Sequence, residues 1–298
     1  AHGDRQRGAV MNAQPKIEGP WSKSIEDRGL VRQPRATLLM RSAIGHLRFD
    51  LPSQLGIPIN IVDSTTKRYR MKVKWAGGDQ LGGRRFPIPA NPKLTDPNSK
   101  DYNLICWDPE SGELFESIAY QPSLGTGVVS TLLGRRDHKA AKAAYWNENE
   151  PFVKLDDSEQ AACVAGQPIA PQLLHPAQLD HRIAICVPPQ FVGSAMLGWT
   201  DGASDADGFV NYATEPHVLV GQTMRLTDID MTGFGSLARK IVHTMQNEGV
   251  GLIMSGNPNT TFLKFVVQKG AFSPADKASL KGLETITGQH LECWGEAA

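Results

Sequence analysis

The stretch Arg68-Tyr69-Arg70-Met71-Lys72-Val73-Lys74-Trp75 decides the fold class of this chain. Apolar or aromatic residues alternate strictly with cations along it, and a period of two residues is the side-chain period of a β-strand. We therefore expect a strand with one buried face and one wet, basic face. Such cations suit a solvated sheet face or a protected sheet edge.

More strand patterns follow toward the C-terminus. Residues 104–108 and 113–120 flank Pro109-Glu110-Ser111-Gly112, whose proline and glycine suit a tight reversal, so this region predicts a hairpin. Further apolar runs typical of strands are residues 182–187, 218–226, 250–254 and 262–267.

Helical patterns are fewer. Residues 234–247 predict an amphipathic helix, with Gly249 placed where a left-handed cap is expected. The apolar stripe of this helix is made by Leu237, Ile241, Val242 and Met245. Ser273-Pro274 opens a second helix, to which Asp276 adds a negative charge in the first turn. Residues 138–146 and 158–165 are weaker helix candidates.

Strands outnumber helices and do not alternate with them regularly, which disfavours a doubly wound parallel sheet. The sequence predicts a mainly β (α+β) protein with an antiparallel β-sandwich or barrel-like core and a few peripheral helices. Residues 1–35 mix charge, glycine and proline, so we expect an extended N-terminal arm, anchored by Trp21, on the body or on a neighbouring subunit. Residues 36–298 are expected to form a single β-rich globular domain.

Charge and hydropathy exclude some classes of function. Lysine plus arginine and aspartate plus glutamate number 31 each, so no overall field attracts nucleic acid or an anionic membrane. No apolar run has the length of a membrane-spanning helix. The first residue, Ala1, is typical of a chain trimmed by signal peptidase or of a cloning scar, and we expect a secreted or periplasmic protein.

The cysteines have no metal-binding spacing. Cys106, Cys163, Cys186 and Cys293 contain no Cys-x-x-Cys pair, which argues against zinc-finger and haem-attachment sites. Either two disulfides or buried free thiols fit this pattern.

An acidic loop is the one candidate for a metal site. Asp201, Asp205 and Asp207 stand close to Gly202 and Gly208, and calcium takes several carboxylates around a tight turn. The spacing does not match an EF-hand, so the loop is either a calcium site of another kind or an acidic surface loop.

Several acidic residues beside the predicted strands are candidates for acid–base chemistry. Cleavage of a glycosidic bond requires two carboxyl groups about 5–10 Å apart. Asp101, Glu116 and His181 are the residues that we expect to be catalytic, because these types titrate usefully near neutral pH. Residues expected to bind a substrate beside them are Trp107, Tyr102, Asn103 and Arg225.

The order of motifs between about residues 86 and 268 resembles a family of secreted bacterial and fungal proteins without settled activity. The motifs are Phe86-Pro87-Ile88-Pro89, Phe115-Glu116, Ser158 to Ile169, His181, Gly221 to Leu226 and Gly249 to Gly256. The chain departs from the family at Asp101-Tyr102-Asn103, where Asp-Arg-His is usual. It also departs at Met254-Ser255-Gly256-Asn257, where the family shows an acidic residue with Asn-Gly.

We therefore expect a secreted carbohydrate-active protein, a polysaccharide hydrolase or lyase, in which Glu116 or Asp101 is the acid or base and His181 orients or protonates. The first alternative is a non-catalytic glycan-binding protein. The second is a structural or accessory subunit of an extracellular or periplasmic assembly, a homo-oligomer or larger complex joined through residues 1–35. The expected partner is a polysaccharide or glycan, without nucleic acid, membrane span or any cofactor besides calcium.

Overall fold

The computed structural model describes residues 16–17, 20–52, 56–73, 85–95, 103–118, 121–122, 138–140, 142–147, 169–195, 218–220, 222–255 and 261–295. Within these ranges the protein is strand-rich and its sheets are mixed, so it is mainly β, as the alternating patterns predicted. The described strands show neither a closed barrel nor a sandwich. None of the described helices is long and apolar enough to cross a membrane.

The largest sheet, here called the main sheet, has the strand order β1-β17-β14-β15-β11-β16-β2. Its strands are β1 (Val31–Arg32), β2 (Arg48–Phe49), β11 (Ile183–Val187), β14 (Thr223–Leu226), β15 (Val250–Ser255), β16 (Phe262–Phe265) and β17 (Leu291–Gly295). The pairs β11–β15 and β16–β2 are parallel and the other pairs are antiparallel. The expected antiparallel arrangement therefore holds for only part of this sheet.

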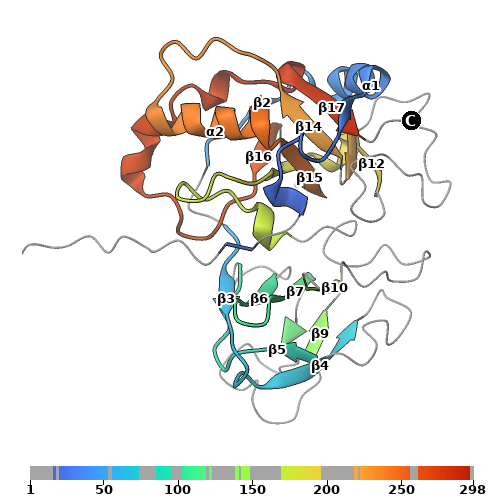
Figure 1. Cartoon of the computed structure of the whole chain (residues 1–298), viewed down its shortest axis with the longest axis vertical. Helices are drawn as coiled ribbons and strands as arrows, with labels where there is room; N and C mark the ends of the chain where they lie inside the picture. Colours follow the sequence, from blue (N-terminus) through green and yellow to red (C-terminus); the bar gives the residue numbers. More distant parts are fainter. Residues whose placement is uncertain are drawn as a thin grey trace, which may run out of the picture.

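Helices α1 (Pro34–Ile44) and α2 (Ser236–Asn247) pack with the main sheet in one apolar cluster. The stripe predicted on α2 is buried, with Leu237, Ile241, Val242 and Met245 all in this cluster. Ile183, Ile185 and Val187 of β11 face the same cluster, whereas Ala184 and Cys186 between them face away from it. Figure 1 shows both helices in the upper part of the molecule together with the main sheet.

A second sheet, the inner sheet, has the order β10-β7-β6-β3. Its strands are β3 (Ile59–Ile61), β6 (Leu104–Asp108), β7 (Glu113–Ile118) and β10 (Lys142–Asn147). The predicted hairpin is confirmed, since β6 and β7 pair antiparallel around Gly112, whose φ is 71°. Every residue of β6 is buried, so neither face of this strand meets water.

An apolar cluster joins the inner sheet to the main sheet, and we call it the junction core. Ile59, Ile105, Trp107 and Leu114 contribute to it from the inner sheet, and Ala184 contributes from β11. The remaining buried members are Ile17, Trp21, Ile57, Ile169, Ala170, Leu173 and Val266. The far face of β11 is therefore covered by the inner sheet.

A third sheet, the outer sheet, has the order β5-β4-β9-β8 and lies at the lower end of the molecule (Figure 1). Its strands are β4 (Arg68–Val73), β5 (Arg85–Pro87), β8 (Gln121–Pro122) and β9 (His138–Ala140). Phe86 of β5 packs on Phe115 of β7 with ring centroids 4.8 Å apart, which joins the outer sheet to the inner sheet. The strand predicted from residue 68 onward is confirmed as β4.

The remaining described elements are short. Strands β12 (Val192–Ala195) and β13 (Val218–Val220) pair parallel with each other. The 3-10 helices are η1 (Pro20–Ser22), η3 (Ala170–Gln172), η4 (Pro189–Phe191), η5 (Pro274–Leu280), η6 (Leu283–Thr285) and η7 (Gly288–His290).

Three local predictions differ from the structure. Residues 138–146 do not form a helix, because β9 and β10 pair with strands from distant parts of the chain, which overrides helix propensity. Residues 218–226 form two strands, β13 and β14, which join different sheets. The segment after Ser273 has the predicted cap with Asp276, but it winds as the 3-10 helix η5. The helix candidate at residues 158–165 lies outside the described residues.

The described part of the expected N-terminal arm packs on the body of the molecule. Trp21 is 1% exposed and Ile25 is fully buried. Strand β1 pairs with β17, and α1 begins at Pro34, within the range expected for the arm. Residues 1–15 lie outside the described residues.

Gly249 has the left-handed conformation predicted for it, with φ of 89°, and a Cβ there would lie 2.9 Å from the carbonyl oxygen of Met224. Gly233 has a similar φ of 82° but open space around the same position. We expect Gly233→Ala to lower the free energy of unfolding by about 1 kcal/mol through backbone strain alone. Gly249→Ala should cost at least about 2 kcal/mol, because the contact adds to the strain. Urea denaturation of both variants tests this, and equal losses would contradict it.

Candidate functional site

Several predicted site residues lie outside the described part of the chain. These are the catalytic candidate Asp101, the binding candidate Tyr102 and the calcium candidates Asp201, Asp205 and Asp207. Among the residues that the structure does describe, no group of histidine, cysteine, aspartate and glutamate side chains is arranged to hold a metal ion.

Glu116 lies in the middle of β7 and its residue is 2% exposed. One carboxylate oxygen accepts the backbone N–H of Ile169 at 2.8 Å, and the other accepts that of Ala170 at 2.6 Å. These donors belong to the start of η3, where the backbone has free N–H groups. The carboxylate therefore holds the inner sheet to the segment that leads into the main sheet.

His181 immediately precedes Arg182 and β11, and its residue is 4% exposed. Its Nδ1 donates to the carbonyl oxygen of Arg182 at 2.9 Å, since a carbonyl can only accept. Burial lowers the pKa of His181 and outweighs the Arg182 carbonyl and the Asp180 charge, which both raise it. The imidazole is therefore neutral at neutral pH.

Trp107 and Asn103 are also buried in the inner-sheet region. Trp107 is 5% exposed and packs in the junction core, and its Nε1 has no hydrogen-bond partner. The backbone N–H of Asn103 donates to Thr95 Oγ1 at 3.0 Å. Trp107 thus fills the core instead of offering a ring face to a sugar.

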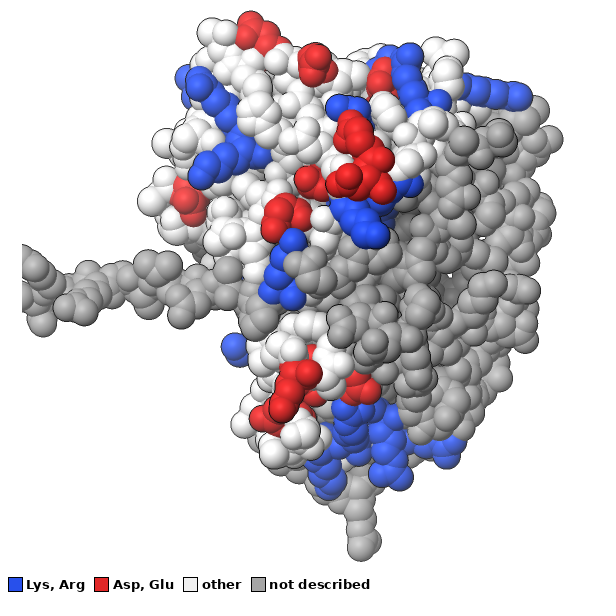
Figure 2. Space-filling model, viewed as in Figure 1, with Lys and Arg blue, Asp and Glu red and all other residues white. Residues whose placement is uncertain are grey.

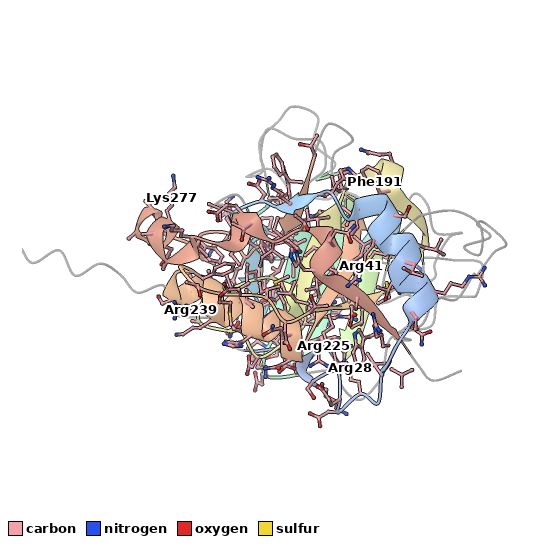
Figure 3. The ribbon with its side chains drawn as sticks, turned by 90° about the horizontal axis from the view of Figure 1, so that it is seen from above. Arg28, Arg41, Phe191, Arg225, Arg239 and Lys277 are labelled. Atoms are coloured by element: carbon pink, nitrogen blue, oxygen red, sulfur yellow. The ribbon has the colours of Figure 1, made fainter. Side chains whose placement is uncertain are left out.

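Arg225 lies on β14 in the main sheet, and Figure 3 labels it near Arg28. Its guanidinium forms an ion pair with Glu26 at 2.9 Å and lies 5.1 Å from the ring centroid of Trp294. Glu116, His181 and Arg225 are therefore bonded to three different segments of the chain. The described contacts do not place them around one shared substrate position.

The outer sheet places cationic residues opposite each other on neighbouring strands, which the sequence pattern of β4 alone does not reveal. Arg70 of β4 stands directly opposite Arg85 of β5 in the antiparallel register, and both residues are exposed. On the other side of β4, Lys72 is in register with Lys139 of β9. Strand β4 is therefore paired, cationic residue opposite cationic residue, with both of its neighbouring strands.

Like charges placed directly opposite each other across a sheet destabilise it, by roughly 0.2–1 kcal/mol per pair. We call the surface formed by the exposed residues Arg70 and Arg85 the basic face. Figure 2 shows lysine and arginine side chains gathered at the lower end of the molecule, where Figure 1 places β4 and β5. The chain has a net charge of +0, so this gathering is a local separation of charge.

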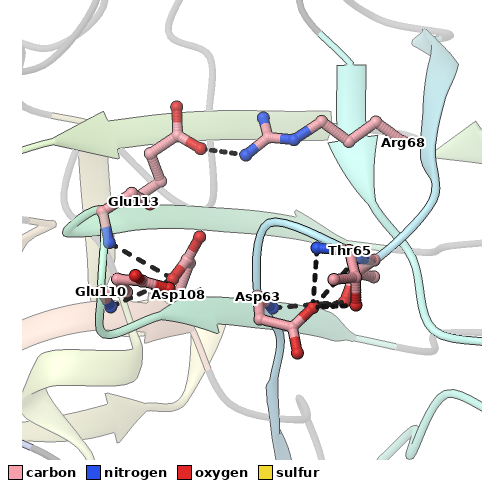
Figure 4. A network of polar contacts seen from close by, with 8 residues as sticks. Asp63, Thr65, Arg68, Asp108, Glu110 and Glu113 are labelled. Carbon is pink, nitrogen blue, oxygen red and sulfur yellow. Dashed lines mark hydrogen bonds and ion pairs between the residues drawn. The ribbon is translucent and has the colours of Figure 1, made fainter.

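An acidic side chain of the inner sheet orients Arg68, the first cation of β4 (Figure 4). Arg68 forms an ion pair with Glu113 of β7, and its guanidinium lies 5.4 Å from the ring centroid of Phe115. Asp108 accepts the backbone N–H groups of Glu110 and of the next residue, which closes the hairpin turn. Arg68 is thereby fixed at the seam between the two sheets.

The basic face could be found only in part from the sequence. The alternation from residue 68 onward predicted cations on one side of a strand. The opposition of Arg70 and Arg85 depends on the register between segments separated by a glycine-rich stretch. Register of this kind is set by pairing in the folded protein.

The described cysteines are free thiols: Cys106, Cys186 and Cys293. Burial raises the pKa of Cys186 and of Cys293 to about 12, and it also raises that of Cys106. These thiols stay protonated at neutral pH and are poor nucleophiles. Cys163 lies outside the described residues.

No family model, curated protein or solved structure matches this chain. A functional assignment must therefore come from the geometry of the described residues.

The bonds of Glu116 make a testable stability prediction. In Glu116→Gln, the side-chain carbonyl oxygen can accept only one of the two backbone N–H groups, and the side-chain amide N–H group faces the other one. We therefore expect the free energy of unfolding to fall by about 2–3 kcal/mol. Ser117→Ala is the matched control, because the neighbouring Ser117 is equally buried and its Oγ has no partner. That change should cost less than about 1 kcal/mol. Urea denaturation that ranks the two variants the other way would contradict this role.

Proposed function

We propose that the protein is a non-catalytic glycan-binding protein and that an acidic polysaccharide lies on the basic face of the outer sheet. The observation that carries this proposal is the direct opposition of the exposed residues Arg70 and Arg85. We place the protein outside the cytoplasm in this proposal, in keeping with the secreted or periplasmic location expected from the sequence.

The charge arrangement favours a polyanionic ligand. Carboxylate or sulfate groups placed between Arg70 and Arg85 would be attracted by both guanidinium groups. Arginine presents several donors in a planar fork that matches carboxylates in a bidentate manner. Neighbouring strands are about 4.8 Å apart, so cations on adjacent strands can contact successive charged groups of one polymer.

An acidic glycan fits this surface better than a nucleic acid does. Sheets that bind single-stranded nucleic acid present exposed aromatic rings on which bases stack. Phe86, the aromatic residue of β5, is buried against Phe115, and Tyr69 on β4 is half-buried with Lys67 Nζ 5.0 Å from its ring centroid. The zero net charge also provides no long-range field toward a nucleic acid.

The binding proposal is favoured over a hydrolase or lyase because of the way in which the candidate catalytic groups are bonded. The Glu116 carboxylate accepts two backbone N–H groups, and the His181 imidazole is buried and donates to a backbone carbonyl. A general acid or base needs a proton path to the substrate, and these bonds direct both groups to the chain itself. The accessory-subunit alternative would use the N-terminal arm, whose described part packs on its own body.

The test is binding to polygalacturonate, with neutral dextran as the reference polymer. We expect the wild-type protein to bind polygalacturonate and not dextran, and to bind more weakly as salt rises, because exposed ion contacts are screened. The double variant Arg70→Gln/Arg85→Gln should lose about tenfold or more in affinity and show a shallower salt dependence. Affinity electrophoresis and titration calorimetry measure both quantities.

The matched control is Arg239→Gln/Lys277→Gln, which removes the same charge from exposed positions in α2 and η5 (Figure 3). This control should bind like the wild type. Equal affinity of the two double variants, or wild-type binding that ignores polymer charge, would refute the proposal.

A further inference from the structure

The described N-terminal residues 16–17 and 20–28 are bound to the body at several points, and we call them the N-terminal clasp. At one end, Lys16 Nζ contacts Asp180 Oδ2 at 2.8 Å. In the middle, the backbone N–H of Arg182 donates to the carbonyl oxygen of Trp21 at 2.7 Å. The Trp21 indole N–H donates to the carbonyl oxygen of Ile17 at 2.7 Å, so these two junction-core residues are held together.

The other end of the clasp is bound where α2 ends. The backbone N–H of Ile25 donates to the carbonyl oxygen of Asn247 at 2.9 Å. The Arg28 guanidinium donates to the carbonyl oxygen of Glu248 at 2.9 Å and to Thr223 Oγ1 at 3.2 Å. The buried Arg182 also donates to Thr223 Oγ1, at 2.6 Å. The clasp therefore spans from the junction core to the end of α2 and to β14 of the main sheet.

Two buried histidines lie in the segment to which the clasp is bound. His175 and His181 are each 4% exposed. Nδ1 of His175 accepts the backbone N–H of Ala177 at 3.1 Å, a bond that requires an unprotonated nitrogen. His181 immediately precedes Arg182, whose N–H holds Trp21. The His175 imidazole is thus built into the docked state in its neutral form, whereas Nδ1 of His181 donates to the Arg182 carbonyl.

The charges around these histidines come from three parts of the chain. The turn itself supplies Asp180, and the clasp supplies Lys16, whose positive charge opposes protonation of His181. The end of α2 adds Glu248, which interacts with Arg28, Asp27, Asp180 and Lys16. Burial lowers the pKa of His175, and His181 lowers it further. Protonating both histidines would therefore bury two mutually repelling cations beside a lysine.

We propose that His175 and His181 form a proton-operated latch, which releases the N-terminal clasp from the body in mild acid. Release would withdraw Trp21 and Ile17 from the junction core, which is the apolar contact between the main and inner sheets. The latch does not depend on the proposed glycan binding, because none of its residues belongs to the outer sheet.

The direction of the pH dependence follows from the lowered pKa values of both histidines. Above the ordinary pKa of about 6.5 the docked and released states are both neutral, and docking is at full strength. As the pH falls below that value, the histidines bind protons more readily in the released state than in the docked state, so docking weakens.

The carboxylates respond differently. Burial raises the pKa of Asp180, but the hydrogen bond and charge of Lys16 outweigh it, so the net pKa is lowered and their ion pair survives at pH 5.5. Burial raises the pKa of Glu248, and its protonation in acid opposes release. A Glu248→Gln variant should therefore leave the histidine effect in place.

Amide hydrogen exchange at pH 7.5 and 5.5, corrected for the intrinsic exchange rate, tests the latch. We expect the protection of residues 20–30 to fall about tenfold or more at pH 5.5, whereas the amides of α2 keep theirs. The double variant His175→Gln/His181→Gln should lose this pH dependence. His243→Gln, on the exposed face of α2, is the matched control and should behave like the wild type.

Titration of the histidine C2 protons in the wild-type protein provides a second readout that needs no variant. Both buried imidazoles should titrate below about 6.5. The proposal is overturned if either titrates at or above that value, or if the protection of residues 20–30 is the same at both pH values. Persistence of the pH effect in a folded double variant would overturn it equally.

Discussion

Strand β6 of the inner sheet is buried on both faces, and the other parts of the fold depend on this constraint. Strand β6 is buried along its whole length, and the junction core on one side and the Phe86–Phe115 contact on the other hold the neighbouring sheets against it. Burying apolar side chains on two faces roughly doubles the stabilisation that one strand can provide. A polar side chain at such a position must find partners within the protein, and Glu116 finds backbone donors of the next segment.

This constraint also decides where charge can be placed. Cations next to the buried parts of the sheets form ion pairs, as Arg68 does with Glu113 and Arg225 does with Glu26. In the outer sheet, by contrast, β4 and β5 present the exposed residues Arg70 and Arg85. The proposed binding surface and the proposed latch therefore lie on opposite sides of the inner sheet. A ligand on the basic face and a proton at His181 would act on different contacts of the same buried layer.

The sequence predicted local features well where they depend on neighbouring residues. The period of two in β4, the Pro-x-x-Gly reversal after β6 and the left-handed Gly249 were all recognised, because each is set by the residues themselves. Features that depend on distant partners were not recognised. The alanine-rich stretch at residues 138–146 has helix-forming composition, yet it pairs as strands with β4 and β7. Glu116 and His181 were identified as functional because of their chemical type, whereas their bonding to backbone groups could be seen only after folding.

The claim most open to direct measurement is that the outer sheet, and no other surface, meets the acidic polymer. Hydrogen exchange of the wild-type protein with and without polygalacturonate would map that contact along the whole chain. The account predicts added protection in residues 68–73 and 85–87 and unchanged exchange in the strands and helices of the main sheet. Protection confined to β14 and β17, or to the segment around His181, would contradict it.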